Sequence, residues 1–140
     1  MIWDQKYFQK FTYSQSQITK YLASARKDLS IAQKTDIEDV RFQFTYNAFI
    51  KLGISLISVT GYKVRSRIGH HIKILEQTSS ILNDENISAY GNQMRKTRNS
   101  ELYDGAMSIT KKQADAYFDF VQQTFQQAEP IFKKYMQTLF

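Results

Sequence analysis

The 140-residue sequence contains no cysteine, only five glycines and a single proline. The absence of cysteine excludes disulfide bonds, thiolate metal ligands and a cysteine nucleophile, and it suits a reducing compartment. So few glycines leave little material for β-hairpins or for glycine-rich phosphate loops. No apolar run approaches the ~20 residues that span a bilayer, and none at the start has the length of a signal peptide. We therefore expect a cytoplasmic, mostly helical protein without a membrane segment.

Positive charge is in excess, with 19 lysines and arginines against 13 aspartates and glutamates and a formal net charge of +6. Such a charge attracts polyanions, including nucleic acid, and it also serves solubility. The basic residues gather in two groups: Lys63, Arg65, Arg67 and Lys73 with His70 and His71, and then Arg95, Lys96 and Arg98. The two histidines are adjacent and point to different helix faces, so neither a metal site nor a cofactor is expected.

Helical periodicity covers most of the chain and predicts an all-α fold. A length of 140 residues suffices for one hydrophobic core, so we expect a single domain over residues 1–140. Five helices are predicted, at about 16–33, 35–61, 65–82, 87–102 and from 110 onward. Capping boxes pair Thr35 with Glu38 and Thr110 with Gln113, and Pro130 should kink the last helix or begin a new one. Short connections indicate an up-and-down antiparallel bundle.

The apolar faces predict how these helices pack. The second helix has apolar residues on two faces, which places it at the centre of the bundle. The first helix has one apolar face: Ile18, Tyr21, Leu22, Ala25, Leu29 and Ala32. The third is expected to turn one stripe inward: Ile68, Ile72, Leu75 and Leu82. His71 shares that stripe and His70 does not, and a histidine on an apolar face is more often a hydrogen-bonded core residue than a ligand.

One charge breaks the pattern of the fourth helix. Arg98 lies in the middle of its apolar stripe, among Ile87, Tyr90, Met94 and Leu102. A buried cation is unfavourable without a partner, so Arg98 either pairs with a carboxylate or lines a cleft open to an anionic ligand. Three carboxylates are candidate partners: Glu101, Asp115 and Asp119.

Four segments follow one another in an informative order: YLASARKDL at 21–29, FTYNAF at 44–49, GYKVRSRIGHH at 61–71 and RNSELY at 98–103. In this order the chain resembles, over residues 14–127, the HEPN family of small helical-bundle domains. Ribonuclease members of that family have an arginine followed after four to six residues by a histidine. The arginine holds phosphate, and the histidine assists attack by the 2′-hydroxyl across a dimer cleft. The resemblance thus implies a homodimer and a nucleotidyltransferase-type antitoxin as a partner.

Arg98 and Asn99 match the start of the HEPN motif, but Tyr103 stands where the histidine would be. Tyrosine has a usual pKa of about 10 and is a poor base at neutral pH, although it can donate a hydrogen bond to phosphate. Glu101 can either orient the guanidinium or act as a base. The predicted catalytic residues are Arg98, Glu101 and Tyr103. The predicted residues for nucleic-acid or nucleotide binding are Arg95, Lys96, Arg98, Asn99, Lys63, Arg65, Arg67 and His70.

Three functions are consistent with these residues. The first is a HEPN-like nucleic-acid or nucleotide-binding module of a toxin–antitoxin or defence system with weak or no nuclease activity, because binding survives the missing histidine better than catalysis does. The second is an active, metal-independent endoribonuclease in which Tyr103, His70 or His71 transfers the proton. The third is a protein-interaction bundle without a nucleic-acid role. An Arg98 sealed against an internal acid would favour the third.

Overall fold

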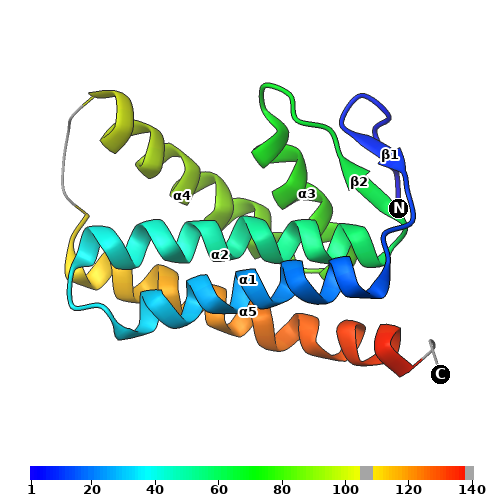
Figure 1. Ribbon diagram of the computed structural model, residues 1–140. Coiled ribbons are helices and arrows are strands. Elements are labelled where there is room, and N and C mark those ends of the chain that lie inside the picture. Colours follow the sequence, from blue (N-terminus) through cyan, green and yellow to red (C-terminus); the bar gives the residue numbers. More distant parts are fainter. Residues whose placement is uncertain (105–108, 138–140) are drawn as a thin grey trace.

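The computed structural model describes residues 1–104 and 109–137. These ranges contain five helices and two three-residue strands (Figure 1). In chain order they are β1 (Phe8–Lys10), α1 (Gln15–Lys34), α2 (Glu38–Val59), β2 (Tyr62–Val64), α3 (His70–Leu82), α4 (Glu85–Asp104) and α5 (Lys111–Gln137). The predicted all-α bundle of about five helices is therefore confirmed. Within the described ranges, no helix is long and apolar enough to cross a membrane.

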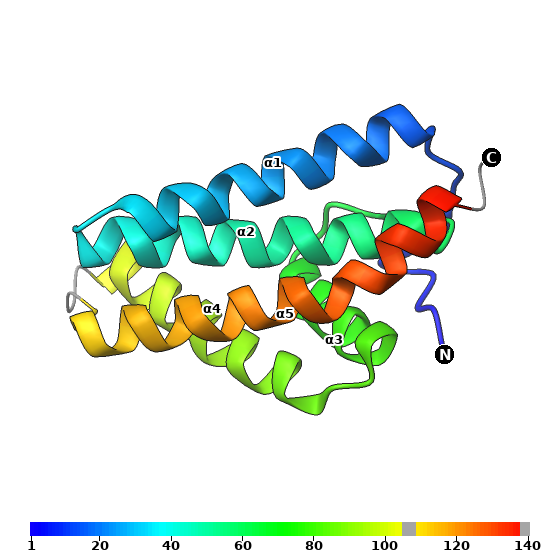
Figure 2. The same ribbon diagram turned by 90° about the horizontal axis from the view of Figure 1, so that it is seen from below.

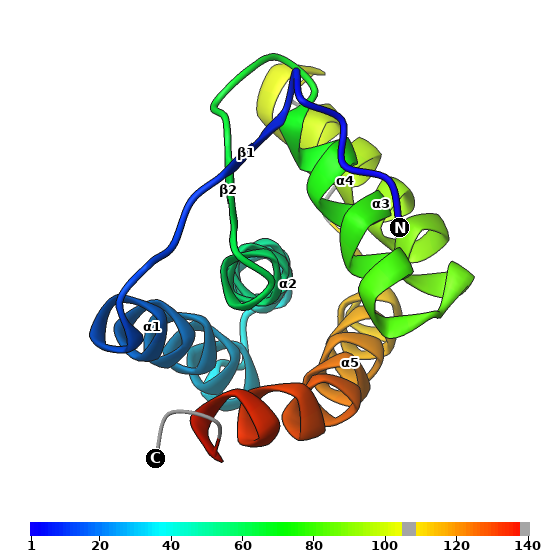
Figure 3. The same ribbon diagram turned by 90° about the vertical axis from the view of Figure 1, so that its right-hand side faces the viewer.

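The second helix lies at the centre of the bundle, as its two apolar faces predict. Seen along its axis in Figure 3, α2 is surrounded by α1, α5, the α3–α4 pair and the two strands. Its largest side chains are fully buried: Phe42, Tyr46, Phe49, Leu52 and Leu56. Burial of each such side chain stabilises the fold by about 1.5–3 kcal/mol, and among the described residues α2 contributes more buried apolar side chains than any other helix.

The predicted start of α2 is wrong. Thr35 ends α1 instead, because its N–H donates to the carbonyl of Ile31 at 3.2 Å. Its hydroxyl accepts from the N–H of Ile37 at 3.2 Å, and α2 begins at Glu38 without a side-chain cap. Two other capping boxes are present: the predicted one joins Thr110 and Gln113 through two bonds of 3.1 Å, and an unpredicted one joins Ser14 and Gln17 at the start of α1.

The predicted start of α3 at about Arg65 is also wrong, because the segment 62–69 forms β2 and a non-helical connection, and α3 begins at His70. β2 pairs antiparallel with β1, with Phe8 opposite Val64. Gly61 and Gly69 have φ angles of 90° and 82°, which interrupt helical geometry on both sides of this segment. As a result Ile68 is 98% exposed rather than inward, and Ile74 and Leu75 form the buried face of α3.

Close helix contacts fix the position of α3. A Cβ atom built on Gly53 of α2 would lie 2.5 Å from Oγ1 of Thr78 and 2.7 Å from Cγ2 of Ile74. Two side chains of α3 therefore pack directly on the backbone of α2, more closely than any residue with a side chain at 53 would allow. On the other side, α3 and α4 are joined at Leu82 and Glu85 and diverge from that connection (Figure 1).

The last helix runs through Pro130 without beginning a new one. Its C-terminal part turns towards α1, as Figure 2 shows, and the two helices meet there. Ala128 and Phe132 pack with Leu22 and Leu52 in a second, smaller cluster of the core. The prediction of a kink at Pro130 thus agrees with the change of direction, whereas the alternative of a separate helix does not.

Candidate functional site

A cavity of about 590 Å³ opens where α3 and α4 diverge. Its lining comes from the segment before α3, the first turn of α3 and the C-terminal half of α4: Arg67, Ile68, Gly69, His70, His71, Ile72, Arg95, Arg98 and Asn99. Five of the eight predicted binding residues meet here, although they come from segments about thirty residues apart. We call this space the Arg98 cavity.

The other three predicted binding residues lie elsewhere. Lys63 is on β2 and its ammonium group lies 4.8 Å from the ring centre of Phe11. Lys96 is exposed on α4 and does not line the cavity. Arg65 lines a different cavity, beside the two strands. Only some residues of the two basic groups of the sequence therefore line the same cavity.

Arg98 pairs with neither Asp115 nor Asp119, and the side chain of Glu101, the third candidate, lies outside the described part of the structure. Asp115 instead binds Arg41 and, at 3.2 Å, Lys111. Asp119 is exposed, and among the described side chains no carboxylate lies within ion-pair distance of Arg98. The guanidinium lies over the ring of Tyr46, with Cζ 5.5 Å from the ring centre. Among the described side chains, the charge of Arg98 is thus offset by an aromatic face and not by an acid.

Two guanidinium groups of the cavity have unsatisfied donors. The Nε atoms of Arg95 and Arg98 are buried and have no hydrogen-bond partner within the described residues. A buried donor without an acceptor costs about 1–3 kcal/mol. None of the residues that line the cavity is acidic, so an anion that enters it would meet donors only.

The start of α3 adds backbone donors to the same space. Gly69 precedes the helix and cannot cap it with a side chain, and the first turn contains no acidic residue. The first N–H groups of a helix have no intrahelical acceptor, and together with the helix dipole they attract anions. The N-terminus of α3 and the guanidinium groups of Arg95 and Arg98 therefore favour the same kind of ligand.

His71 is held by a tyrosine from the central helix. Its Nδ1 lies 2.9 Å from the hydroxyl oxygen of Tyr46, so the hydrogen bond expected for this histidine is present. Burial, followed by the charges of His70, Arg98 and Arg95, lowers the pKa of His71 from 6.5 to about 4. Burial raises the pKa of Tyr46 to about 12, against the opposing effect of Arg98 and Arg95. Both groups are therefore neutral at pH 7.

The neutral pair has a defined proton arrangement. Tyr46 is 1% exposed, and within the described residues His71 is the hydrogen-bond partner of its hydroxyl. The hydroxyl proton is satisfied only if Tyr46 donates to Nδ1, which leaves the imidazole proton of His71 on Nε2. His71 therefore acts as a further hydrogen-bond donor and not as a base.

His70 has the opposite arrangement. Its Nδ1 lies 2.6 Å from the carbonyl oxygen of Arg67. A carbonyl oxygen only accepts, so Nδ1 carries the proton, and in the neutral ring Nε2 has a lone pair. Of the two histidines in the cavity, His70 is the one that can accept a proton at Nε2.

The lowered pKa of His71 predicts a pH-dependent stability. Between pH 6.5 and about 4 the unfolded chain binds a proton at His71 that the folded protein excludes, so the free energy of unfolding should fall with falling pH in this window. Allowing for partial solvent screening, we expect a loss of about 1–2 kcal/mol. Urea unfolding of the wild type and of His71→Gln at several pH values measures it. An identical pH dependence in the two proteins would contradict the assignment.

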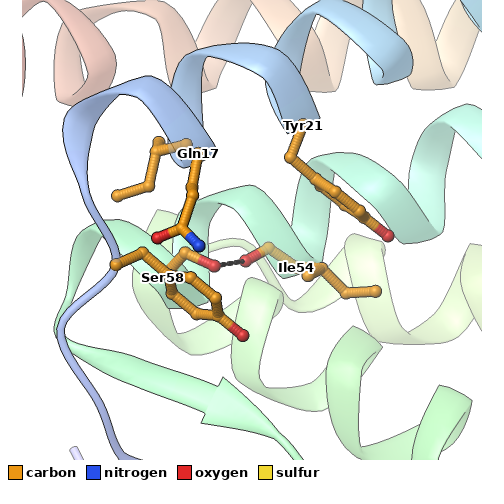
Figure 4. A pocket seen from close by; sticks show the side chains of 6 residues that line it. Gln17, Tyr21, Ile54 and Ser58 are labelled. Carbon is orange, nitrogen blue, oxygen red and sulfur yellow. Dashed lines mark hydrogen bonds between the residues drawn. The ribbon is translucent and has the colours of Figure 1, made fainter.

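A smaller cavity, of about 140 Å³, lies between α1 and α2 (Figure 4). It is lined by Tyr13, Gln17, Ile18, Tyr21, Ile54 and Ser58. The hydroxyl of Ser58 donates to the carbonyl of Ile54 at 2.8 Å, and none of the lining residues is charged. This cavity contains no predicted site residue and lacks the groups that bind anions.

The sequence did not identify Tyr46 as part of the site. The available signal was a tyrosine on the buried face of a central helix, because a buried hydroxyl requires a partner. Glu101 and Tyr103, by contrast, were predicted as catalytic residues from their place after Arg98. They belong to the last turns of α4, and their side chains lie outside the described part of the structure.

Comparisons with known proteins provide no assignment. No family model matches the chain, no curated protein is similar to it in sequence, and no solved structure matches its fold. A proposal for the function therefore rests on the geometry and charge of the Arg98 cavity.

Proposed function

We propose that the Arg98 cavity binds phosphate groups of RNA, and that the protein is a HEPN-like RNA-binding module with weak or no nuclease activity. The observation that supports this proposal is the meeting of Arg67, Arg95 and Arg98 in one cavity whose lining contains no acid. Guanidinium groups bind phosphate through two parallel hydrogen bonds, and such charged bonds are stronger than neutral ones.

The neutral donors of the cavity suit the same ligand. His71 presents its Nε2 proton, Asn99 contributes a side-chain amide, and the first turn of α3 contributes backbone N–H groups. An oxyanion with several acceptor oxygens satisfies many donors at once, which a single carboxylate does less completely. Phosphate is therefore favoured over other anions.

Weak or absent nuclease activity follows from the protonation states. His71 has a pKa of about 4 and accepts from Tyr46, so it is unsuited to remove a proton from a 2′-hydroxyl at neutral pH. Tyr46 has a pKa of about 12 and remains protonated. Both residues fit a role in binding.

Salt dependence tests this function. If three arginines each contact a phosphate, the logarithm of the affinity for single-stranded RNA should fall with the logarithm of salt concentration with a slope of about −2 or steeper. Arg95→Gln should reduce that slope by about 0.7, because one phosphate contact is removed. Fluorescence anisotropy of a labelled oligoribonucleotide between about 50 and 200 mM salt measures both values. An affinity that does not change with salt would refute RNA binding through these residues.

An active endoribonuclease is a second candidate, and His70 favours it. His70 and Arg98 line the same cavity, so a group that can act as a base and a phosphate-binding group occur together. Metal-independent cleavage of RNA in the presence of EDTA, abolished in His70→Gln, is the expected result for this candidate. Intact RNA after prolonged incubation with the wild type would exclude it and leave the binding module.

The resemblance to HEPN domains extends the proposal to assembly and context. We infer a cytoplasmic homodimer in which the Arg98 cavities of two subunits face one another, within a toxin–antitoxin or defence system that includes a nucleotidyltransferase-type antitoxin. Two facing arginine clusters repel, so RNA or another anion would stabilise the dimer. Sedimentation at micromolar concentration with and without RNA tests this arrangement, and a monomer under both conditions would exclude it.

A further inference from the structure

A second basic cavity adjoins the same stretch of chain as the Arg98 cavity. It has a volume of about 280 Å³ and is lined by Trp3, Gln5, Phe8, Gln9, Lys10, Tyr62 and Arg65. None of these residues is acidic. We call this space the Trp3 cavity.

The Trp3 cavity contains stacked aromatic rings. Trp3 lies parallel to Tyr62, with ring centres 4.0 Å apart and an angle of 8° between the planes. Phe8, which is buried, meets Trp3 edge to face at 5.2 Å. Trp3 and Tyr62 are both partly exposed, and Tyr62 has no second ring contact among the described residues. A flat group that enters the cavity can therefore extend this stack.

Polar groups around the rings suit a nucleotide. Arg65 and Lys10 have no ion pair among the described residues, and Nε of Arg65 is buried without a hydrogen-bond partner there. The amides of Gln5 and Gln9 provide both donors and acceptors, which can bind the polar edges of a base. The combination of aromatic rings with cationic side chains is typical of proteins that bind single strands.

The two cavities are lined by residues that lie two positions apart in the chain. Arg65 lines the Trp3 cavity and Arg67 lines the Arg98 cavity, so their Cα atoms are separated by at most about 7 Å. Tyr7 fixes this segment, because its carbonyl accepts from the N–H of Arg65 at 2.7 Å and its hydroxyl donates to the carbonyl of Ile68 at 3.4 Å. A single strand of a few nucleotides is long enough to span this distance, so one strand can occupy both cavities.

We infer that the Trp3 cavity stacks an unpaired base of the RNA strand whose phosphate occupies the Arg98 cavity. This inference rests on the proposed function and specifies its substrate as single-stranded RNA, because the bases of a duplex are stacked on one another and are not free to stack on a protein ring. The Trp3 cavity supplies the base contact, and the Arg98 cavity supplies the phosphate contact.

The experiment compares inorganic phosphate, a single-stranded adenylate tetranucleotide and an RNA duplex. Trp3→Ala should weaken binding of the tetranucleotide about tenfold and leave the affinity for inorganic phosphate, which has no base to stack, unchanged. Because Trp3 is the only tryptophan, its fluorescence should also be quenched by the tetranucleotide in the wild type. Arg65→Gln serves as a second variant, because it leaves the aromatic rings in place. Of the ligands compared, it should lower the affinity for the tetranucleotide alone.

Phe11→Ala is the matched control, because it removes a partly exposed aromatic ring of the same N-terminal segment that lines neither cavity. Loss of tetranucleotide binding in this control as well, or a tetranucleotide affinity that depends on Arg98 but on neither Trp3 nor Arg65, overturns the inference. Equal binding of the duplex overturns it too. If the wild type binds none of the three ligands, the proposed function itself fails.

Discussion

Arg98→Ala is expected to weaken the binding of single-stranded RNA about 100-fold and to change the melting temperature by only a few degrees. A guanidinium donates two charged hydrogen bonds to a phosphate, each worth about 1.5 kcal/mol, and the sum of about 3 kcal/mol corresponds to that decrease. The fold should survive, because no described carboxylate depends on Arg98 and the substitution removes its packing on the ring of Tyr46 without breaking an ion pair. Anisotropy titration and thermal unfolding measure the two quantities.

Arg26→Ala is the control for this variant. Arg26 is an exposed residue of α1, paired with Glu129 at 3.1 Å and absent from both basic cavities, so its removal changes the net charge equally. Arg98→Lys retains the charge but not the paired donors, and it should show an intermediate affinity. A strongly destabilised Arg98→Ala protein would indicate a structural role, and unchanged RNA binding would favour a protein-interaction bundle.

Gly53→Val is expected to lower the free energy of unfolding by about 3 kcal/mol, or the melting temperature by about 10 °C. Even the first added carbon would lie 2.5 Å from Thr78 and 2.7 Å from Ile74, both on α3. The two helices must separate to accept it, which displaces α3, whose first turn lines the Arg98 cavity. Chemical denaturation measures the change in stability, and RNA affinity should fall as well.

Ala89→Val provides the comparison for that change, because Ala89 is exposed on α4 and the substitution also introduces a valine within a helix. Its effect should stay near the small difference in helix propensity, below about 1 kcal/mol. Equal destabilisation by the two substitutions would show that the close approach of α2 and α3 contributes nothing to stability.

The helices whose residues alternate between core and solvent could be predicted from the sequence. In α1, Ile18, Leu22, Ala25 and Ala32 are buried as expected, because one turn of helix imposes a 3.6-residue period on any surface helix. The strands could not be predicted in this way. Each strand is three residues long, and α1 and α2 lie between the two strands in the sequence, so no local pattern predicts their pairing.

In the site, too, some residues could be predicted from a local sequence pattern and others could not. Arg98 could be singled out because it interrupts an apolar stripe, which is a local signal. The approach of Arg67 and His70 depends on the fold, since it requires α3 to begin at His70 and to lie beside α4. The prediction that Ile68 points inward was wrong because α3 begins only at His70, so the helical periodicity assumed for residues 65–69 does not apply.

The pairing of β1 with β2 also has a consequence for the order of folding. The two strands are separated by 51 residues, so closing this loop early would cost considerable chain entropy, whereas α1 and α2 are neighbours in sequence and can form a hairpin first. Once that hairpin exists, its open end brings Phe11 and Gly61 together, where the N–H of Phe11 donates to the carbonyl of Gly61 at 3.0 Å. The strands, and with them residues 65–69, should therefore become ordered late, and their amides should exchange with solvent earlier than those of α2.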